Sequence, residues 1–449
     1  MDVQENDANP VEASARPRER VVTSPQEALQ LAVEMHRRGN VEQAEEIYTA
    51  VLAHEPDNSS ALQFLGVLRH GQGRETEALD LLQRATEAAP DSPGTFMNYG
   101  NVLLEAGEAD SAVDAYKRML ELAPDHAGAW NNMGVLLRTL GRIEVAEEAL
   151  RKAIALAPED AGPWHNLGNL LLSAGRIQES VECALRSVTL LPESTVGRKL
   201  LGVAYAYLGE AEKAKAVFYQ WLEETPDDPT ALHHLAALEG RVPERASDAY
   251  VEDVFDKFAA SFDSKLEMLE YRAPELVRDS LAAMVGDRRV SVLDVGCGTG
   301  LVGPLIQGRV GHLTGIDLSG KMLAKAKTRG VYDALEKAEF IAYLGAVERG
   351  FGAIIAADSL CYVGPMDAFS ANALAALEPG GVMIGTFEAD DDENAVTLGY
   401  SGRYTHGSAY LAKTFAAAGF EAVSVEPQVL RMEQGKPVHG YMLTARRPG

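Results

Sequence analysis

The stretch "SVLDVGCGTG" combines an apolar strand, an acid and a glycine-rich turn. The strand is expected to end at Asp294, and three glycines follow on alternate positions: Gly296, Gly298 and Gly300. Glycine permits a tight turn and lets a ligand lie against bare backbone, while the next helix offers free N–H groups. A second acid, Asp317, ends the next apolar strand, where a carboxylate can accept both hydroxyls of a ribose. Together these residues predict a site for a ribose-containing ligand.

The glycine spacing separates two classes of site. A dinucleotide site has the order G-x-G-x-x-G, and the place of its third glycine is occupied here by Leu301. The order D-x-G-x-G-x-G instead resembles motif I of the class I S-adenosylmethionine-dependent methyltransferases. "GIDLS", "AADSLCYVG" and "LEPGG" follow in the order that this family shows. The resemblance implies S-adenosyl-L-methionine as cofactor and methyl transfer as the reaction.

The resemblance also implies individual roles for the cofactor residues. Asp294 would organise the amino group of the methionine part, Asp317 would hold the ribose, and Met322 would pack on the adenine. Glu339 would meet the adenine amine if "KAEFIAYL" is the third strand, although "LEKAEFIAYL" could equally form one helix. The full set expected to bind the cofactor is Asp294, Gly296, Cys297, Gly298, Gly300, Asp317, Leu318, Met322 and Glu339.

Apolar strands alternate with helical segments after residue 286, which predicts a Rossmann-like domain with a mostly parallel sheet of seven strands. The last two strands, "EAVSVEP" and "GYMLTAR", have no helix between them and are expected to pair antiparallel. Residues 245–449 also resemble a group of predicted bacterial methyltransferases that carry tetratricopeptide repeats. The pieces that match are "FDSKLEMLEYRAPELV", "AADSLCYVG", "SGRYTHGSAYL" and "GKPVHGYMLTARR".

Candidate acceptor residues lie in the segments after the fourth and fifth strands. His406 or Tyr404 could deprotonate or orient the acceptor, and Arg403 could bind a carboxylate; alternatively Arg403 and Tyr404 pack the loop and His406 caps the next helix. Asp358 and Tyr362 are expected to contact the acceptor, with a purely structural hydrogen bond as the alternative for Asp358.

Aromatic residues before the sheet domain could form a lid that excludes water from the cofactor. Phe255, Phe258 and Phe262 share one helical face, and Tyr271 follows as a further acceptor contact. The alternative is an amphipathic helix packed on the sheet. No metal site is expected, because the acidic run "ADDDEN" is typical of a solvated loop and the three cysteines form no close pair.

The first half of the chain repeats every 34 residues. Prolines recur at Pro56, Pro90, Pro124, Pro158, Pro192 and Pro226. Glycines recur at Gly66, Gly100, Gly134, Gly168 and Gly202. This period matches the tetratricopeptide pattern, in which small residues sit where two helices cross and proline separates the repeats. Six repeats and a capping helix are expected, and stacked repeats form a superhelical array.

The domain organisation follows from these patterns: a flexible tail over 1–24, a tetratricopeptide α-solenoid over 25–240, a helical linker or lid over 241–285, and a methyltransferase core over 286–449. The array is expected to bind a protein or peptide, or another copy of the chain. Asparagines at two repeat positions could bind a peptide backbone or tie neighbouring helices together. They are Asn98, Asn132 and Asn166 at one position, and Asn101 and Asn169 at the other.

The composition narrows the class of partner and the compartment. A formal charge of −25 makes nucleic acid a poor partner, and no apolar run is long enough to cross a membrane. We expect a cytoplasmic enzyme that methylates an oxygen on a peptide, a carrier-bound intermediate or a small molecule. Two alternatives stay open: a small-molecule methyltransferase whose repeats only mediate oligomerisation, and a non-catalytic scaffold that senses S-adenosylmethionine.

Overall fold

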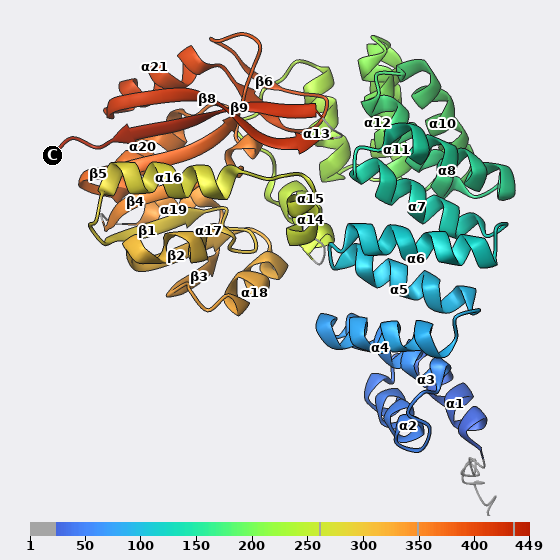
Figure 1. The fold of residues 1–449 in the computed structure, drawn as a ribbon. Helices are drawn as coiled ribbons and strands as arrows, with labels where there is room; N and C mark the ends of the chain where they lie inside the picture. The colour runs from blue at the N-terminus through green and yellow to red at the C-terminus, as the bar shows by residue number, and fades with distance from the viewer. Residues whose placement is uncertain (1–23, 260–261, 348–349, 434–435) are drawn as a thin grey trace, which may run out of the picture. The chain divides into compact units, whose positions relative to one another are not determined.

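The computed structural model describes residues 24–259, 262–347, 350–433 and 436–449 (Figure 1). The predicted tail therefore lies outside the described residues, apart from Ser24. The chain divides into two compact units, Met1–Asn98 and Tyr99–Gly449, and each is described by itself. The division falls inside the helical array, because each repeat contacts mainly its neighbours. The predicted domain boundaries stay predictions.

The first unit consists of helical hairpins. Its complete helices are α1 (Pro25–Arg37), α2 (Val41–His54), α3 (Ser59–Gly71) and α4 (Glu75–Ala88). Ser24 caps α1 by accepting a hydrogen bond from the Glu27 N–H at 3.2 Å. A Cβ atom on Gly66 would lie 2.8 Å from Leu82 Cγ, so α3 and α4 cross closely at the repeated glycine. This close crossing explains why a small residue recurs at that position.

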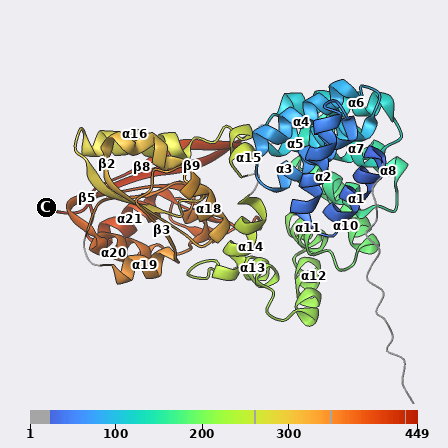
Figure 2. The ribbon, with the colours of Figure 1, turned by 90° about the horizontal axis from the view of Figure 1, so that it is seen from below.

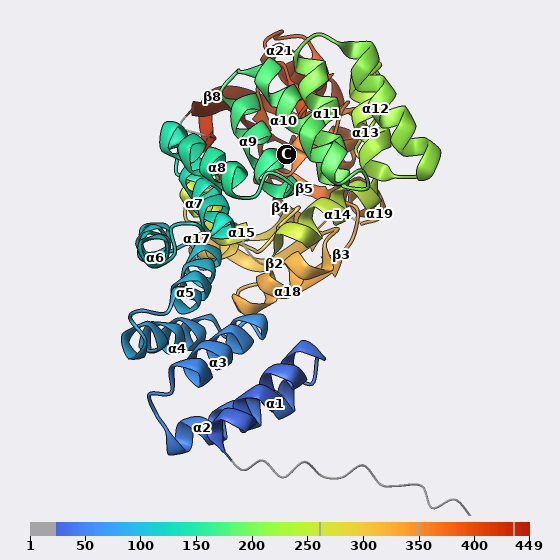
Figure 3. The ribbon, with the colours of Figure 1, turned by 90° about the vertical axis from the view of Figure 1, so that its right-hand side faces the viewer.

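The second unit continues the same helical pattern. The helices are α5 (Pro93–Glu105), which begins in the first unit, α6 (Ala109–Leu122), α7 (Ala127–Thr139), α8 (Ile143–Leu156), α9 (Ala161–Ser173), α10 (Ile177–Leu190), α11 (Thr195–Tyr207), α12 (Ala211–Glu224) and α13 (Pro229–Leu238). Figure 3 shows α7 to α12 stacked in chain order. Helices α1 to α12 follow one another in the order expected for helical hairpins, so the prediction of a helical repeat array is confirmed, while its division into six repeats stays a prediction.

Recurrent contacts fix the repeats locally. The indole N–H of Trp130 donates to the Pro124 carbonyl at 2.7 Å, and that of Trp164 donates to the Pro158 carbonyl at 2.9 Å. A Cβ atom on Gly202 would lie 2.4 Å from a Phe218 ring atom, which again requires glycine at the crossing. Small and large residues therefore alternate across each hairpin.

A seven-stranded sheet follows, in the order β3-β2-β1-β4-β5-β9-β8. Its strands are β1 (Val290–Val295), β2 (Val310–Asp317), β3 (Ala334–Lys337), β4 (Phe351–Ala356), β5 (Leu377–Glu388), β8 (Glu421–Glu433) and β9 (Lys436–Arg446). Strands β1 to β5 pair parallel, while β9 pairs antiparallel with both β5 and β8. The predicted sheet and its antiparallel last pair are confirmed.

Helices cover both faces of the sheet. Buried residues of α16 (Ala273–Val285) and α17 (Val302–Ile306) pack on one face. Those of α19 (Phe340–Ala346), α20 (Asp367–Ala376) and α21 (Ser408–Ala418) pack on the other. Figure 2 shows α16 and α20 on opposite sides of the strands. Two faces buried by helices explain why β4 is buried at every position.

Three further elements border the carboxyl ends of the parallel strands. Helices α14 (Asp248–Phe258) and α15 (Phe262–Met268) precede the sheet, and α18 (Gly320–Thr328) follows β2.

Within the described residues, no helix is both long and apolar enough to cross a membrane.

Two sequence expectations about local structure are wrong. The segment around His406 is not a loop: Tyr404–His406 forms β7, which pairs antiparallel with β6 (Val396–Leu398). The third strand is Ala334–Lys337, not "KAEFIAYL", because Glu339 accepts hydrogen bonds from two backbone N–H groups and starts helix α19.

Candidate functional site

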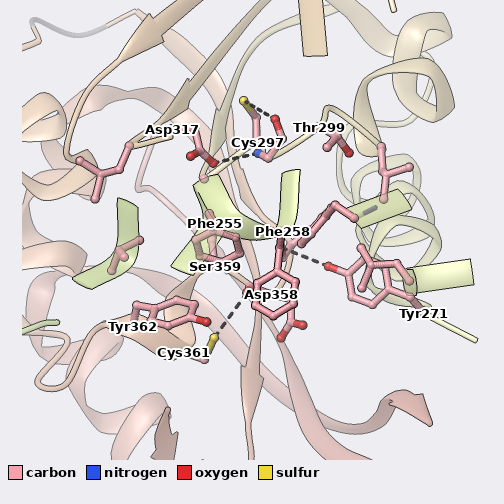
Figure 4. A pocket seen from close by; sticks show the side chains of 18 of the residues that line it. Phe255, Phe258, Tyr271, Cys297, Thr299, Asp317, Asp358, Ser359, Cys361 and Tyr362 are labelled. Atoms are coloured by element: carbon pink, nitrogen blue, oxygen red, sulfur yellow. Dashed lines mark hydrogen bonds between the residues drawn. The ribbon is translucent and has the colours of Figure 1, made fainter. Parts of the chain in front are cut away.

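A cavity of about 310 Å³ lies at the carboxyl ends of the parallel strands, bordered by α14 and α15. Figure 4 shows Asp317 and Cys297 at one end of this cavity and Asp358, Cys361 and Tyr362 at the other. In parallel α/β sheets this edge is where ligands bind. We call the end with Asp317 and Cys297 the glycine-turn end, and the end with Asp358, Cys361 and Tyr362 the Asp358 end.

The glycine turn adopts a backbone that only glycine accepts readily. Gly296, Gly298 and Gly300 have φ angles of +65°, +55° and +80°. A Cβ atom on Gly296 would lie 2.4 Å from Ser359 Cβ, and one on Gly300 would lie 2.8 Å from a Tyr332 ring atom. The turn is therefore required by close packing as well as by its backbone angles.

Asp317 holds this turn in place. Its carboxylate accepts hydrogen bonds from the Gly298 N–H at 2.9 Å and from the Ser319 N–H at 2.8 Å. Burial raises the pKa of Asp317, while these backbone donors oppose the rise. Each oxygen keeps a lone pair that could accept a ligand hydroxyl.

Asp294 is the most isolated acid of the site. It is 1% exposed, and its Oδ2 accepts a hydrogen bond from the Tyr332 hydroxyl at 2.7 Å. Its Oδ1 is buried with no hydrogen-bond partner among the described residues. Burial, with a contribution from nearby Asp317, raises the pKa of Asp294 to about 7. A buried, unpaired carboxylate oxygen on a cavity wall fits a ligand that carries an amino group.

The other expected cofactor residues divide into two groups. Cys297, Leu318 and Glu339 line the cavity, although the Glu339 carboxylate already accepts from the Ile341 and Ala342 N–H groups at 3.0 and 2.8 Å. Met322 is fully buried and does not line the cavity, so its expected contact with adenine is not supported. Gly300 likewise does not line the cavity and instead makes room for Tyr332 and Ala326.

Asp358 lies at the opposite end of the cavity in an unusual conformation. Its φ angle is +57°, which is rare for a residue with a side chain. The Asp358 N–H donates to Thr386 Oγ1 at 2.7 Å, and Asp358 Oδ2 accepts from Arg431 at 2.7 Å. Its Oδ1 is buried without a hydrogen-bond partner among the described residues. Burial raises the pKa of Asp358, and the Arg431 charge opposes the rise.

A buried ion cluster supports Asp358. Arg431 is 3% exposed and also lies 2.5 Å from Glu388 and 2.8 Å from Glu433. Arg403 shares both glutamates, at 2.9 Å from Glu388 and 3.1 Å from Glu433. Three carboxylates thus face two guanidinium groups, which leaves one uncompensated negative charge. The Arg403 guanidinium is already paired, and this contradicts its expected role as a carboxylate-binding group.

Sequence reasoning missed Arg431, Glu388 and Glu433. They come from the ends of β5 and β8, more than 40 residues apart, and no short motif connects them. The available signal was Arg431 between the apolar residues Leu430 and Met432 of β8, since buried arginines need ion partners.

The aromatic residues expected to form a lid do border the cavity. The Phe255 ring lies 6.1 Å from Phe262 and 5.4 Å from Tyr362, and all three line the cavity. Tyr271 also lines it and donates its hydroxyl to the Ala357 carbonyl at 3.3 Å. Phe258 is 46% exposed, so it closes the cavity only partly.

Polar bonds hold α14 and α15 to the cofactor side of the sheet. Asp263 bonds with the Thr299 hydroxyl and with Arg329, the latter at 2.5 Å. Ser319 donates its hydroxyl to Asp256 at 2.5 Å. The two helices therefore contact both the glycine turn and the start of α18.

The structure does not bring His406 and Tyr404 to the cavity. Both are fully buried, and neither lines it. His406 Nε2 lies 2.9 Å from the Gly364 carbonyl oxygen, and burial lowers its pKa to about 4. Tyr404 packs with Leu398 and with Ala236 and Ala237 of α13. Their expected role as a base on the acceptor is therefore corrected: both are core residues.

Two further expectations concern metals and asparagines. Among the described residues, ligand atoms of Asp358, Cys361 and Glu388 lie within 4.8 Å of one another, but both carboxylates are bonded to Arg431. The asparagines of the second unit bond to one another between repeats: Asn132 Nδ2 donates to Asn101 Oδ1 at 3.0 Å, and Asn166 Nδ2 donates to Asn131 Oδ1 at 2.9 Å. These bonds favour the structural interpretation of the asparagines.

Comparisons with known proteins agree with this organisation. A family model described as "Cilia and flagella-associated protein 70 C-terminal domain" matches residues 8–254, more than half of the chain. The chain belongs to this family of helical repeats. A second model, described as "Methyltransferase domain", matches residues 292–381. The chain therefore joins a tetratricopeptide-type array to a methyltransferase domain.

Solved structures give weaker likenesses. The chain is 17% identical to PilF of Pseudomonas aeruginosa over 47% of this chain and 96% of that chain, with a TM-score of 0.43. It is 19% identical to PilW, a type IV pilus biogenesis factor, over 46% and 96%, with a TM-score of 0.44. For YrrB, a TPR protein with an unusual peptide-binding site, the identity is 18% over 39% and 90%, with a TM-score of 0.35. Likenesses at this level say nothing about function. No curated protein matches the chain.

Proposed function

We propose that the chain transfers a methyl group from S-adenosylmethionine to an acceptor hydroxyl. One observation carries the proposal: each end of a single cavity has a buried carboxylate oxygen, Asp294 Oδ1 or Asp358 Oδ1, that has no hydrogen-bond partner within the part of the chain that the structure describes. The glycine turn and Asp317 stand beside the first, and the aromatic residues of α14 and α15 stand over the second. The matched methyltransferase model spans the segment that contains both acids.

At the glycine-turn end the residues fit the cofactor. Asp294 Oδ1 can accept a hydrogen bond from its amino group, and Asp317 can accept from its ribose hydroxyls. Gly296 and Gly298 leave the backbone open to its methionine part. When bound, S-adenosylmethionine supplies an electrophilic methyl group on a positively charged sulfur.

At the Asp358 end, which we call the acceptor end from here on, the chain can hold the acceptor and take its proton. An acceptor O–H can donate to Asp358 Oδ1, while Arg431 holds Oδ2 at 2.7 Å. Asp358, whose pKa burial raises, would take the proton of the breaking O–H bond while the methyl group passes from sulfur to oxygen, with S-adenosylhomocysteine as the leaving group. Positioning of the oxygen can supply a large part of the acceleration. Phe255, Phe262 and Tyr362 exclude water from this end.

The charge of the cavity narrows the acceptor class. The ion cluster around Arg431 is saturated with acids, so a carboxylate would be repelled, whereas a neutral hydroxyl beside aromatic rings would fit. A peptide, a carrier-bound intermediate and a small molecule can each present such a hydroxyl.

We propose that the repeat array recruits a protein that bears or delivers the acceptor. Three free cysteines suit a reducing compartment such as the cytoplasm.

The test is radiolabelled methyl transfer from S-adenosylmethionine into an extract of the source organism, separated by size. Asp358→Asn is the matched variant, because it keeps the shape and loses the base. Label transferred by the wild type and lost by Asp358→Asn is the expected result. Label on a protein would support recruitment by the array, and label on small molecules would favour the oligomerisation alternative. Absence of both label and S-adenosylhomocysteine binding would refute the proposal.

A further inference from the structure

The last helices of the repeat array contact the segment that carries Arg403 into the cavity. This segment, residues 399–403, connects β6 to β7. The Tyr207 ring of α11 meets the Tyr400 ring edge-on at 5.5 Å. Helix α13 packs against the same region through Ala236 and Ala237, which form a buried cluster with Leu398 and Tyr404.

One hydrogen bond joins α13 directly to the residue before Arg403. His233 is 6% exposed, and its Nε2 lies 2.9 Å from the Gly402 carbonyl oxygen. Because a carbonyl oxygen can only accept, His233 Nε2 must carry the hydrogen. The His233 ring also stacks on Tyr250 of α14, with ring centres 4.2 Å apart.

Gly402 leaves no room for a side chain within this contact. Its φ angle is +84°, and a Cβ atom there would lie 2.5 Å from the Tyr250 hydroxyl and 3.3 Å from His234 Cε1. The His234 ring stacks in turn on Phe218 of α12, at 5.6 Å between ring centres. The segment is therefore held between the last repeat, the capping helix and α14.

The constraint on Gly402 reaches the acceptor end of the cavity. Arg403 follows Gly402 and pairs with Glu388 and Glu433. These two glutamates also bind Arg431, which in turn holds Asp358 Oδ2. If Gly402 shifted, Arg403 would leave the shared glutamates and Arg431 would change its partners.

We propose that His233, on the capping helix of the array, is a positioning residue for the acceptor end of the cavity. By fixing Gly402 it fixes Arg403 and, through the shared glutamates, the orientation of Asp358. The inference rests on the proposed methyl transfer and gives the array a second role besides recruitment. The array then forms part of the support of the catalytic site.

The test compares His233→Leu with His233→Gln in the full chain. Leucine removes the donor, whereas the glutamine amide can donate to the Gly402 carbonyl from a similar distance. Tyr219→Phe is the control, because it removes the 2.7 Å bond from Tyr219 to Glu239 at the other side of α13. Each variant is assayed for S-adenosylhomocysteine affinity by calorimetry, for label transfer into the extract, and for amide hydrogen exchange over residues 399–406.

We expect His233→Leu to lower label transfer at least tenfold and to raise exchange over 399–406, with cofactor affinity within twofold of the wild type. His233→Gln should recover most of the transfer, and Tyr219→Phe should resemble the wild type. Unchanged transfer and exchange in His233→Leu would overturn the inference. So would a joint loss of affinity and transfer with raised exchange over 294–300, since that reports general destabilisation. A wild type that fails to bind S-adenosylhomocysteine would instead refute the proposed function, and the exchange measurement would then test only whether His233 fixes residues 399–406.

Discussion

The glycine-turn end of the cavity is built from residues 294–319, whereas the acceptor end takes its charged groups from the turn after β4, from β5 and β8, and from the segment before β7. At the first end, Asp317 bonds to backbone N–H groups of its near neighbours. At the second, the charged side chains of Asp358, Glu388, Arg403, Arg431 and Glu433 form ion pairs with one another across the sheet. A site fixed by backbone depends on few contacts. A site fixed by side-chain ion pairs depends on all its members together.

Replacing Arg431 by Met should lower the unfolding free energy more than the other substitutions proposed below, because it removes the central cation of the acceptor end. Three carboxylates would then remain with the single charge of Arg403, and an uncompensated buried charge costs about 3–5 kcal/mol. We expect Arg431→Met to lower the free energy of unfolding at pH 7 by about this amount, measured by urea denaturation.

The exposed pair of Arg278 and Asp279 provides the matched control. Arg278→Met should leave the unfolding free energy close to the wild-type value, because exposed pairs contribute little. The double variant Arg431→Met with Glu388→Gln should recover part of the loss. Equal losses in Arg431→Met and Arg278→Met would show that the buried ion cluster contributes no more to stability than an exposed ion pair.

Replacing Gly296 by Ala should break the glycine-turn end. The added Cβ atom would lie 2.4 Å from Ser359 Cβ on a backbone with a φ angle of +65°. Left-handed backbone and overpacking together cost about 2–4 kcal/mol. We expect S-adenosylhomocysteine affinity, measured by calorimetry, to fall by more than tenfold. Gly320→Ala is the control because a Cβ atom there meets nothing within 4 Å; if both variants bound equally well, the turn would not be the cofactor site.

Asp317→Ala tests the carboxylate of the same end with a smaller expected effect. It removes the acceptor of the Gly298 and Ser319 N–H groups and the proposed ribose contact. Lost hydrogen bonds to a charged group cost about 1–3 kcal/mol, so affinity for S-adenosylhomocysteine should fall in proportion. Unchanged affinity would remove the ribose from this position.

The difference between the two ends also explains what the sequence could predict. The strands and the helical repeats depend on local patterns, and these predictions were confirmed. The glycine turn has the positive φ angles that its sequence favours, while its role as the cofactor site stays a prediction. Asp358 was reached because it follows a predicted strand directly. Arg431, Glu388 and Glu433 were missed because their side chains meet only when β5, β9 and β8 pair in that order in the sheet. No short sequence motif shows this order.

The errors have an equally local cause. His406 was placed near the acceptor because its segment follows the fifth strand, yet that segment pairs as β7. Side chains alternate along a strand, so Tyr404 and His406 both point into the core and only Thr405 points away. Met322 follows the N-cap of α18, and the turn of that helix buries it.

The protonation of Asp294 gives a prediction for the pH dependence of cofactor binding at the glycine-turn end. Its pKa of about 7 in the folded chain exceeds the ordinary value of 3.8, so the folded state holds the proton more tightly. The contribution of Asp294 to the stability of the folded chain therefore falls as pH rises from about 4 to about 7. Binding of a cationic amino group needs the ionised form, so affinity for S-adenosylhomocysteine should rise up to tenfold per pH unit below about 7 and level off above it. Asp294→Asn should flatten this profile; a profile that keeps its slope would assign the titration to another group.

Tyr332→Phe sharpens the same comparison with the smallest expected effect. The Tyr332 hydroxyl donates to Asp294 Oδ2 at 2.7 Å and lowers the pKa that burial raises. Phenylalanine keeps the ring that packs against Gly300 and removes this donor, at a cost of about 1 kcal/mol in unfolding free energy. The rise of affinity with pH should then move to higher pH, measured by calorimetry across the same range. A shift toward lower pH would mean that the hydroxyl stabilises the protonated acid.

Label transfer by Tyr332→Phe at high pH should stay near the wild-type value, because among the described residues the acceptor end shares no hydrogen bond with Tyr332. Any larger loss would show that the two ends are coupled through the cavity.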